Sequence, residues 1–132
     1  MSGGRVLSMK TVIRCRDFAC SRDFYTRVLG FAVAEEWEEP QGRGAIFHVE
    51  GVGACIEIYG MTHADSRFHE SFQQALANDK IDIQLETESL ASWVRRLEGV
   101  WAFEGPEDLP WGQRWIRLRD PDRLLIAIYE RK

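Results

Sequence analysis

The stretch that decides the fold of this 132-residue chain is DPDRLLIAIYE at residues 120–130, a tight turn followed by an apolar strand. A second copy of the strand lies far upstream, where residues 54–59 read ACIEIY. The segments IEIY and IAIY match at every position except one, where Glu57 corresponds to Ala127. A repeated strand predicts that the fold is built from two copies of one unit.

The composition restricts the class of protein. A chain of 132 residues with 45% hydrophobic residues is large enough for one compact domain with its own core. The formal net charge is -4, and the 17 basic and 21 acidic residues are spread along the sequence. This distribution disfavours nucleic acid and anionic membranes as partners. We therefore expect a small organic molecule as the partner, with no nucleic acid and no membrane.

The cysteines and the apolar runs indicate a cellular compartment. Cys15, Cys20 and Cys55 are odd in number and lack metal-finger spacing, which disfavours a disulfide framework and a structural zinc site. No apolar run approaches the roughly 20 residues that cross a bilayer, and no signal-peptide core precedes the first strand-like segment. The sequence therefore predicts reduced thiols and a cytoplasmic location.

The first half of the chain reads as a strand, a helix and three strands. Asp17 is suited to cap a helix over residues 18–29, and Gly30 is suited to end it. An acidic loop is expected at residues 38–44. Strands are predicted at residues 7–14, 31–37, 45–49 and 54–59. Module one therefore spans about residues 7–60.

The same order recurs after a connector at residues 61–80, which carries a helix-compatible piece over residues 66–77. Module two spans about residues 81–130. Its helix is predicted over residues 90–98, with Gly99 in the terminating position. Its other elements are strands at residues 81–87, 100–104 and 113–119, a proline-bearing loop at 105–111, and the final turn and strand.

Two motifs at opposite ends of this repeat resemble those of a known family. They are RDFYTRVLGF at residues 22–31 and RDPD at residues 119–122, followed by LIAIYE at residues 125–130. From about Met9 to Glu130 the chain resembles the glyoxalase/bleomycin-resistance/extradiol-dioxygenase family, also called the vicinal oxygen chelate superfamily. The resemblance implies a single α+β domain over residues 1–132, in which tandem βαβββ modules form an open, curved mixed β-sheet barrel with helices outside. It also implies a homodimer.

The final turn departs from the family pattern at one position. Arg123 stands where the family usually has glycine. This substitution predicts a turn that does not require a positive backbone angle at residue 123. We expect it to alter the local geometry of the turn and to leave the fold unchanged.

Enzymes of this family hold one divalent metal with side chains from four strands. The resemblance places these four positions at Lys10, Glu57, Asp82 and Ala127. A protonated lysine repels a cation, and the methyl group of alanine coordinates nothing. We therefore predict no metal and no cofactor. The alternative is a divalent metal held by a reduced set of ligands.

Strand alternation, combined with the resemblance, extends the lining of the cleft. The ligand-binding candidates on strands are Lys10, His48, Glu57, Tyr59, Asp82, Gln84 and Tyr129. His48 belongs to this set if the hairpin before Cys55 turns at Gly51-Val52. Lys10, Glu57 and Asp82 have two readings, an ion-pair cluster that fills the vacated metal position or a hydrogen-bonding floor for a polar ligand.

Aromatic and basic residues add candidates near the mouth of the predicted barrel. Trp111, between Pro110 and Gly112, is a candidate for stacking on a flat ligand. Trp37 and Trp115 are either ligand contacts or half-buried strand residues. For a ligand carboxylate or phosphate we name Arg114, although the strand register leaves Arg114 and Arg117 as alternatives.

Three functions are compatible with these residues. The favoured one is a metal-free binding protein that holds a partly aromatic or polar organic molecule in a tryptophan-rimmed cleft, as antibiotic-sequestering members of the family do. The alternative is a lyase, isomerase or dioxygenase, either metal-free with Glu57 as the catalytic base or metal-dependent with a reduced ligand set. The third is a dimeric interaction module whose cleft is filled by side chains.

Overall fold

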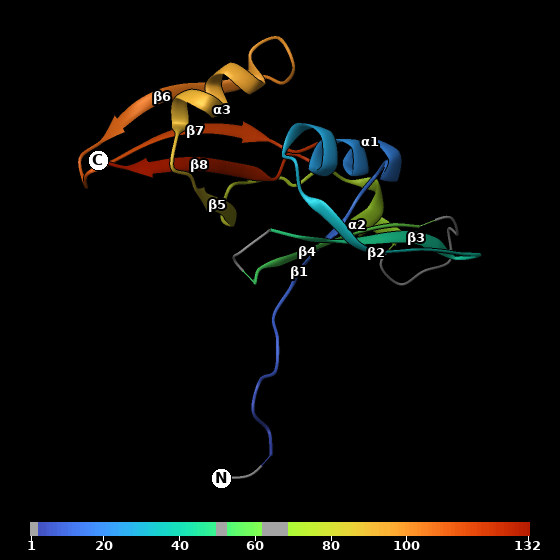
Figure 1. The fold of residues 1–132 in the computed structure, drawn as a ribbon. Helices are drawn as coiled ribbons and strands as arrows, with labels where there is room; N and C mark the ends of the chain where they lie inside the picture. Colours follow the sequence, from blue (N-terminus) through green and yellow to red (C-terminus); the bar gives the residue numbers. More distant parts are fainter. Residues whose placement is uncertain (1–2, 50–52, 62–68) are drawn as a thin grey trace. The chain divides into compact units, whose positions relative to one another are not determined.

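The structure is a computed structural model that describes residues 3–49, 53–61 and 69–132. The chain divides into two compact units, Met1–Gln73 and Gln74–Lys132 (Figure 1). Each unit contains one open, four-stranded mixed sheet, and the α+β class and the tandem βαβββ order predicted from the sequence are confirmed. None of the helices in the described residues has the length and apolar composition needed to cross a membrane.

The sheet of the first unit, called sheet 1, has the strand order β1-β4-β3-β2. Its β1 runs parallel to β4, and the other neighbouring strands are antiparallel. Parallel pairing requires a crossover connection between the two strands, and the helix lies within it. The elements of this unit are β1 (Thr11–Arg14), α1 (Phe18–Asp23), the π-helical turn η1 (Phe24–Val28), β2 (Ala32–Glu39), β3 (Gly42–His48), β4 (Cys55–Met61) and α2 (His69–Gln73).

The first helix begins and ends at the residues that the sequence indicates. The side chain of Asp17 accepts a hydrogen bond from the Cys20 amide at 3.1 Å, which satisfies a donor at the start of α1. Gly30 follows the helix with a φ of 76°, a conformation that glycine adopts without steric cost. Between them, the amide of Leu29 donates to the carbonyl of Phe24 at 3.0 Å, so the last turn is π-helical.

This helix covers one face of sheet 1 with aromatic side chains. Phe24 and Tyr25 are fully buried and lie edge to face with their ring centroids 5.0 Å apart. Tyr25 also stacks on Phe47 of β3 at 5.7 Å. On β4, Ile56 and Ile58 are buried, and the partly buried residues that alternate with them, Cys55, Glu57 and Tyr59, point to the other side of the sheet. We call that second side the open face of sheet 1.

The second unit repeats this design in sheet 2, whose strand order is β5-β8-β7-β6 with β5 parallel to β8. Ser89 caps its helix by accepting from the Ser92 amide at 3.1 Å, and Glu130 accepts from the Leu90 amide at 3.0 Å. Gly99 ends the helix region with a φ of 73°. The elements are β5 (Asp82–Glu86), α3 (Leu90–Leu97), β6 (Phe103–Leu109), β7 (Gln113–Arg119) and β8 (Leu125–Arg131).

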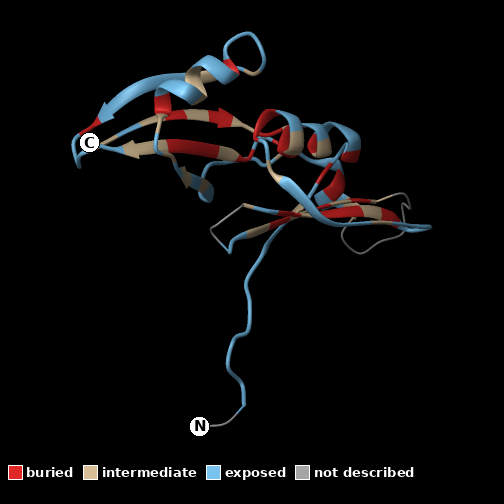
Figure 2. Ribbon diagram, viewed as in Figure 1, coloured by how far each residue is buried: buried red, intermediate tan, exposed pale blue. Residues whose placement is uncertain are grey.

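The core of the second unit lies between α3 and sheet 2. Leu90 and Leu97 of the helix are buried, as are Ile116, Ile126 and Ile128 of the sheet (Figure 2). Because side chains alternate along a strand, the neighbours of these isoleucines point away from α3. We call that side the open face of sheet 2. Each unit therefore buries its own helix against its own sheet.

Several element boundaries differ from those predicted. The expected loop at residues 38–44 is mostly strand, because Glu39 pairs with Gly42 across a two-residue turn. The expected loop at residues 105–111 belongs largely to β6, where a shift of register between Glu104 and Glu107 accommodates Gly105-Pro106. Pairing satisfies backbone donors and acceptors that a loop would leave to water.

Two predicted elements are shorter than expected. The first strand begins at Thr11, so residues 7–10 precede the sheet as an extended segment. The helix expected over residues 66–77 appears as α2 at His69–Gln73. Residues 62–68 of the predicted connector and the turn at 50–52 lie outside the described residues.

The final turn is organised by a buried carboxylate. Asp120 Oδ1 accepts from the amides of Asp122 and Leu124, each at 2.8 Å. Within this turn Arg123 has a φ of 69°, so the prediction of a turn without a positive angle is wrong. Asp120 accepts a further, closely spaced hydrogen bond in this tight turn. The Arg123 amide donates to the Asp120 carbonyl at 2.9 Å, and the Leu124 amide donates to Asp120 Oδ1 as given above. The left-handed conformation makes both contacts compatible.

Replacing Arg123 with glycine should therefore stabilise the protein. A non-glycine residue in the left-handed region costs about 1–2 kcal/mol, and the added flexibility of glycine in the unfolded chain offsets part of the gain. We expect Arg123→Gly to raise the free energy of unfolding by about 0.5–1 kcal/mol in urea titrations. Arg123→Ala is the control, because it removes the same side chain and keeps the backbone cost. Equal stability of the two variants would contradict this explanation.

Candidate functional site

The open face of sheet 1 brings together the first-unit residues that the sequence singled out. The strand register places Ile46 of β3 and Val12 of β1 on either side of Glu57. One row further, His48 lies opposite Cys55, with its Nδ1 atom 4.0 Å from the thiol sulfur. The register therefore places His48 on the same face as Glu57. Tyr59 lies on the same face because it is two residues from Glu57.

An ion pair occupies the centre of this face. Lys10 Nζ donates to Glu57 Oε1 at 2.6 Å, and only 13% of the Glu57 side chain is exposed. The hydrogen bond and the negative charge of Glu57 raise the pKa of Lys10, so the amine is protonated at neutral pH. Glu57 Oε2 has no hydrogen-bond partner among the described residues. The carboxylate therefore retains one free acceptor on the open face.

Trp37 belongs to the edge strand β2, and its side chain lies over the open face of sheet 1. Its register partner is Gly44 of β3, and a Cβ atom built on Gly44 would come within 2.1 Å of the indole Cζ2 atom. The missing side chain of Gly44 thus makes room for the ring, which is half-buried. Beyond it, Tyr59 packs edge to face on Phe72 of α2 at 5.8 Å. An aromatic group therefore lies beside the polar centre.

The sequence left the role of Trp37 open, and the pairing of the strands reveals its position. A tryptophan on one strand directly opposite a glycine on the next is the signal that would have indicated it. That signal requires the register of β2 and β3. From the sequence, Gly44 is predicted in a loop at residues 38–44 and not in β3, so it is not paired with Trp37.

The open face of sheet 2 carries a second aromatic group. Trp111 is 62% exposed after β6, and its ring lies edge to face with that of Trp115 at 6.1 Å. The indole Nε1 of Trp111 donates to Gln113 Oε1 at 3.0 Å. In contrast, Nε1 of Trp115 is buried and has no hydrogen-bond partner among the described residues. Tyr129 is the register partner of Trp115 on β8.

The polar candidates on β5 bond to each other. Gln84 Nε2 donates to Asp82 Oδ2 at 3.0 Å, and both side chains are exposed. Gln84 is the register partner of Ala127, which is fully buried. The amide and the carboxylate therefore stand on the edge strand, beside the alanine that corresponds to Glu57.

The strand register separates the two arginines that the sequence left as alternatives. Arg114 pairs with Glu130, whose carboxylate caps α3, and forms an ion pair with Asp108 at 3.3 Å. It therefore lies on the side of the sheet opposite to Trp115 and Tyr129. Arg117 pairs with Ala127 on the open face instead. Of the second-unit candidates, the structure thus groups Asp82, Gln84 and Tyr129 on one face and places Arg114 on the other.

The chain consists of two βαβββ units. In each unit a helix covers one face of the mixed sheet and the other face is open. This arrangement defines the class of paired βαβββ proteins. Within this class, the profile of the Glyoxalase/Bleomycin resistance protein/Dioxygenase superfamily matches residues 9–128. The chain belongs to this superfamily, which confirms the resemblance carried by the two terminal motifs.

Solved structures with the same fold include TnmS3, an antibiotic binding protein from Streptomyces sp. CB03234, with 19% identity, a TM-score of 0.71 and coverage of 99% of this chain and 100% of that one. A superfamily member from Sphaerobacter thermophilus DSM 20745 has 22% identity, a TM-score of 0.74 and coverage of 96% and 98%. A bleomycin-binding protein complexed with bleomycin has 18% identity, a TM-score of 0.66 and coverage of 96% and 100%. These likenesses show a shared fold. Comparison with curated proteins gave no match.

The side chains at the four family metal positions do not fit a divalent cation. Lys10 places a positive charge 2.6 Å from the Glu57 carboxylate, and Ala127 offers only a methyl group. Asp82 already accepts from Gln84. In the part of the chain that the structure describes, no three side chains of His, Cys, Asp or Glu gather at a common point. We therefore assign no chemical step to a metal.

Proposed function

We propose that the protein binds a small, partly aromatic organic molecule without the family metal. The observation that supports this most directly is the position of Trp37, whose indole lies over Gly44 beside the polar residues of the same face. A half-buried ring offers apolar area for stacking, and the free Glu57 Oε2 offers a hydrogen-bond acceptor. Lys10, His48 and Tyr59 complete the proposed contacts in this unit.

On the second unit, the proposed contacts lie on the open face of sheet 2 and beside it. Trp111 is an exposed ring for a flat ligand, and Tyr129, Gln84 and Asp82 offer polar groups. Two proteins of the same fold have a function of this kind. One of these proteins binds an antibiotic and the other binds bleomycin. For this chain, ligand sequestration or resistance is the function we propose on that basis.

A thermal-shift screen tests the proposal. The protein would be purified without chelator, and its Tm measured with bleomycin, planar aromatic antibiotics and aromatic metabolites, each with and without EDTA. We expect at least one compound to raise Tm, because a ligand that binds only the folded state stabilises it. The rise should persist in EDTA. A rise that disappears with chelator would contradict the metal-free proposal, and no rise with any compound would favour an interaction module.

A second candidate function is an enzyme in which Glu57 acts as a general base. The free acceptor Oε2 supports this candidate, since a base needs an unoccupied oxygen that faces the substrate. The discriminating measurement is recovery of the compound that the screen identifies. A binding protein returns it chemically unchanged after prolonged incubation, as mass spectrometry would show. Conversion that disappears in Glu57→Gln would establish the enzyme and overturn pure sequestration.

The proposal also includes a homodimer in the cytoplasm, with no nucleic-acid or membrane partner. The superfamily resemblance supports the dimer, and the dispersed charge with a net value of -4 supports the absence of polyanionic partners. Light scattering coupled to size-exclusion chromatography measures the oligomeric state directly.

A further inference from the structure

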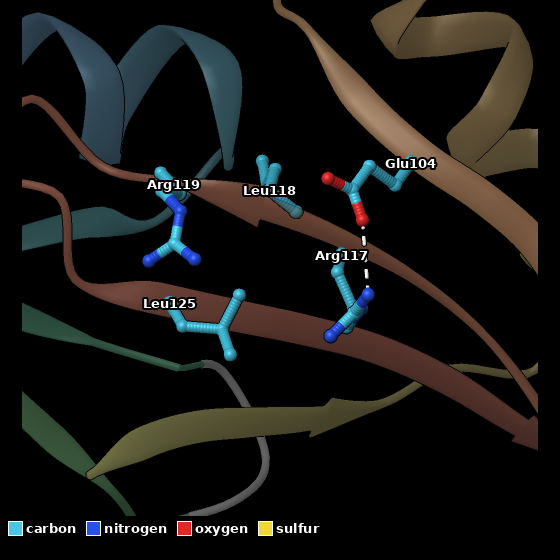
Figure 3. Close-up of a pocket in the computed structure, with 5 residues that line it drawn as sticks. All are labelled: Glu104, Arg117, Leu118, Arg119 and Leu125. Carbon is cyan, nitrogen blue, oxygen red and sulfur yellow. Dashed lines mark hydrogen bonds and ion pairs between the residues drawn. The ribbon is translucent and has the colours of Figure 1, made fainter. Parts of the chain in front are cut away.

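Two arginines stand side by side on the open face of sheet 2. Arg117 and Arg119 are two residues apart on β7, so strand geometry directs both side chains to the same side (Figure 3). Their register partners on β8 are Ala127 and Leu125, whose side chains contain no hydrogen-bond acceptor. The guanidinium groups therefore stand over an apolar strand. An anion that reaches this surface meets two guanidinium groups, each of which also pairs with a carboxylate.

A hollow lies between these two side chains. It is lined by Glu104, Arg117, Leu118, Arg119 and Leu125 and has a volume of about 90 Å³ (Figure 3). Sites that enclose a whole drug-sized molecule measure roughly 300–1,000 Å³. The hollow is thus suited to one small charged group of a larger molecule, whose remaining part would lie on the open face.

The two arginines differ in how firmly they are held. Arg119 donates to both carboxylate oxygens of Asp79, at 2.6 and 2.8 Å, and to the carbonyl of Arg123 at 3.1 Å. Its hydrogen bonds and charge hold the pKa of Asp79 below the usual range. Arg117 forms a single hydrogen bond, from Nη2 to Glu104 Oε2 at 2.9 Å. Among the described residues, its other two nitrogens have no hydrogen-bond partner.

The partner of Arg117 is easily replaced. Glu104 lies on the edge strand β6, and 78% of its side chain is exposed to solvent. Exposed ion pairs contribute little to stability, because water and salt screen them. A ligand carboxylate can therefore bind the free nitrogens of Arg117 beside Glu104 or take the place of Glu104. The guanidinium fork suits a planar carboxylate, which it binds through two parallel hydrogen bonds.

We infer that the hollow between Arg117 and Arg119 binds the carboxylate of an aromatic organic acid, with Arg117 as the direct contact and Arg119, held by Asp79, as the opposite wall of the hollow. The aromatic part of the acid can pack on Trp115, because the centroid of that ring lies 5.6 Å from the Arg117 guanidinium carbon. This inference rests on the proposed function and specifies the chemical class of its ligand. The anion contact is therefore Arg117 and not Arg114, whose side chain lies on the opposite side of the sheet.

Isothermal titration calorimetry with matched probes tests the inference. The probes are naphthalene-1-acetate, the neutral naphthalene-1-acetamide of the same shape, and 1-naphthyl phosphate. We expect the carboxylate to bind at least about tenfold more tightly than the amide. Arg117→Gln should remove this preference, and Arg117→Lys should restore only part of it, because lysine keeps the charge and loses the fork. The control is Arg114→Gln, which removes the same charge from the opposite face of β7 and should leave both affinities unchanged.

Four results would overturn the inference. Equal affinity for acid and amide would exclude an anion site while leaving general ligand binding, tested separately by the thermal-shift screen, intact. An equal loss in Arg114→Gln and Arg117→Gln would mean that only net charge matters. Tighter binding of the phosphate ester than of the carboxylate would assign the hollow to a different anion. Absence of binding by all three probes would likewise count against the site.

Discussion

In Asp120→Ala, the free energy of unfolding is expected to fall by about 3 kcal/mol. The carboxylate oxygen Oδ1 accepts two backbone hydrogen bonds at 2.8 Å, from Asp122 and Leu124, and the side chain is buried. Alanine would leave both donors without this acceptor, and each buried unsatisfied group costs roughly 1–3 kcal/mol. Urea unfolding followed by circular dichroism measures the loss.

Asp120→Asn is the matched control for this experiment. The amide oxygen of asparagine occupies the position of Oδ1 and accepts the same two bonds, so we expect a loss of only about 1 kcal/mol. The contrast separates the role of the acceptor from that of side-chain volume. If Asp120→Ala lost no more stability than Asp120→Asn, the two backbone contacts would not be what holds the final turn.

Trp37→Ala is expected to raise the dissociation constant of the screened ligand about 10- to 100-fold. Truncating a central tryptophan in a binding site commonly costs 2 kcal/mol or more, roughly thirtyfold in affinity. Here the ring lies over Gly44 on the face that also carries Glu57 and His48. The measurement is calorimetry with the compound that gives the largest rise in Tm.

Two further variants make this prediction specific. Gly44→Ala keeps the tryptophan but forces its ring to move, because the new Cβ atom would lie 2.1 Å from Cζ2. It should weaken binding in the same direction. Trp93→Ala is the control, since Trp93 stands on α3 with its ring 5.1 Å from the Arg96 guanidinium carbon. Equal weakening by Trp37→Ala and Trp93→Ala would remove Trp37 from the site.

The features that the sequence predicted correctly depend on local chemistry or on the repeat. Asp17 and Gly30 bound the first helix because a capping carboxylate and a left-handed glycine act within a few residues. The likeness of IEIY to IAIY identified equivalent strands. Family membership followed from motifs at both ends of the chain.

The features that the sequence did not predict depend on strand register and on backbone conformation. Which arginine faces the open side follows from the pairing of Gln113 with Arg131, which no single-strand pattern specifies. The contact of Trp37 with Gly44 needs the register of β2 and β3, and the predicted loop at residues 38–44 included the end of β2 and the start of β3. The positive φ of Arg123 is imposed by the hydrogen bonds to Asp120, which override the residue's own preference.

The separate core of each unit has a consequence for how such a protein can evolve. Phe24 and Tyr25 pack within the first unit, and Leu90 and Leu97 pack within the second, so each of these clusters lies on the helix-covered side of its own sheet. After a gene duplication, a mutation on one open face would therefore be tolerated without loss of folding. The difference between Glu57 in one copy and Ala127 in the other is the kind of divergence that this arrangement permits. New ligand preferences can then arise by drift on one half of the molecule.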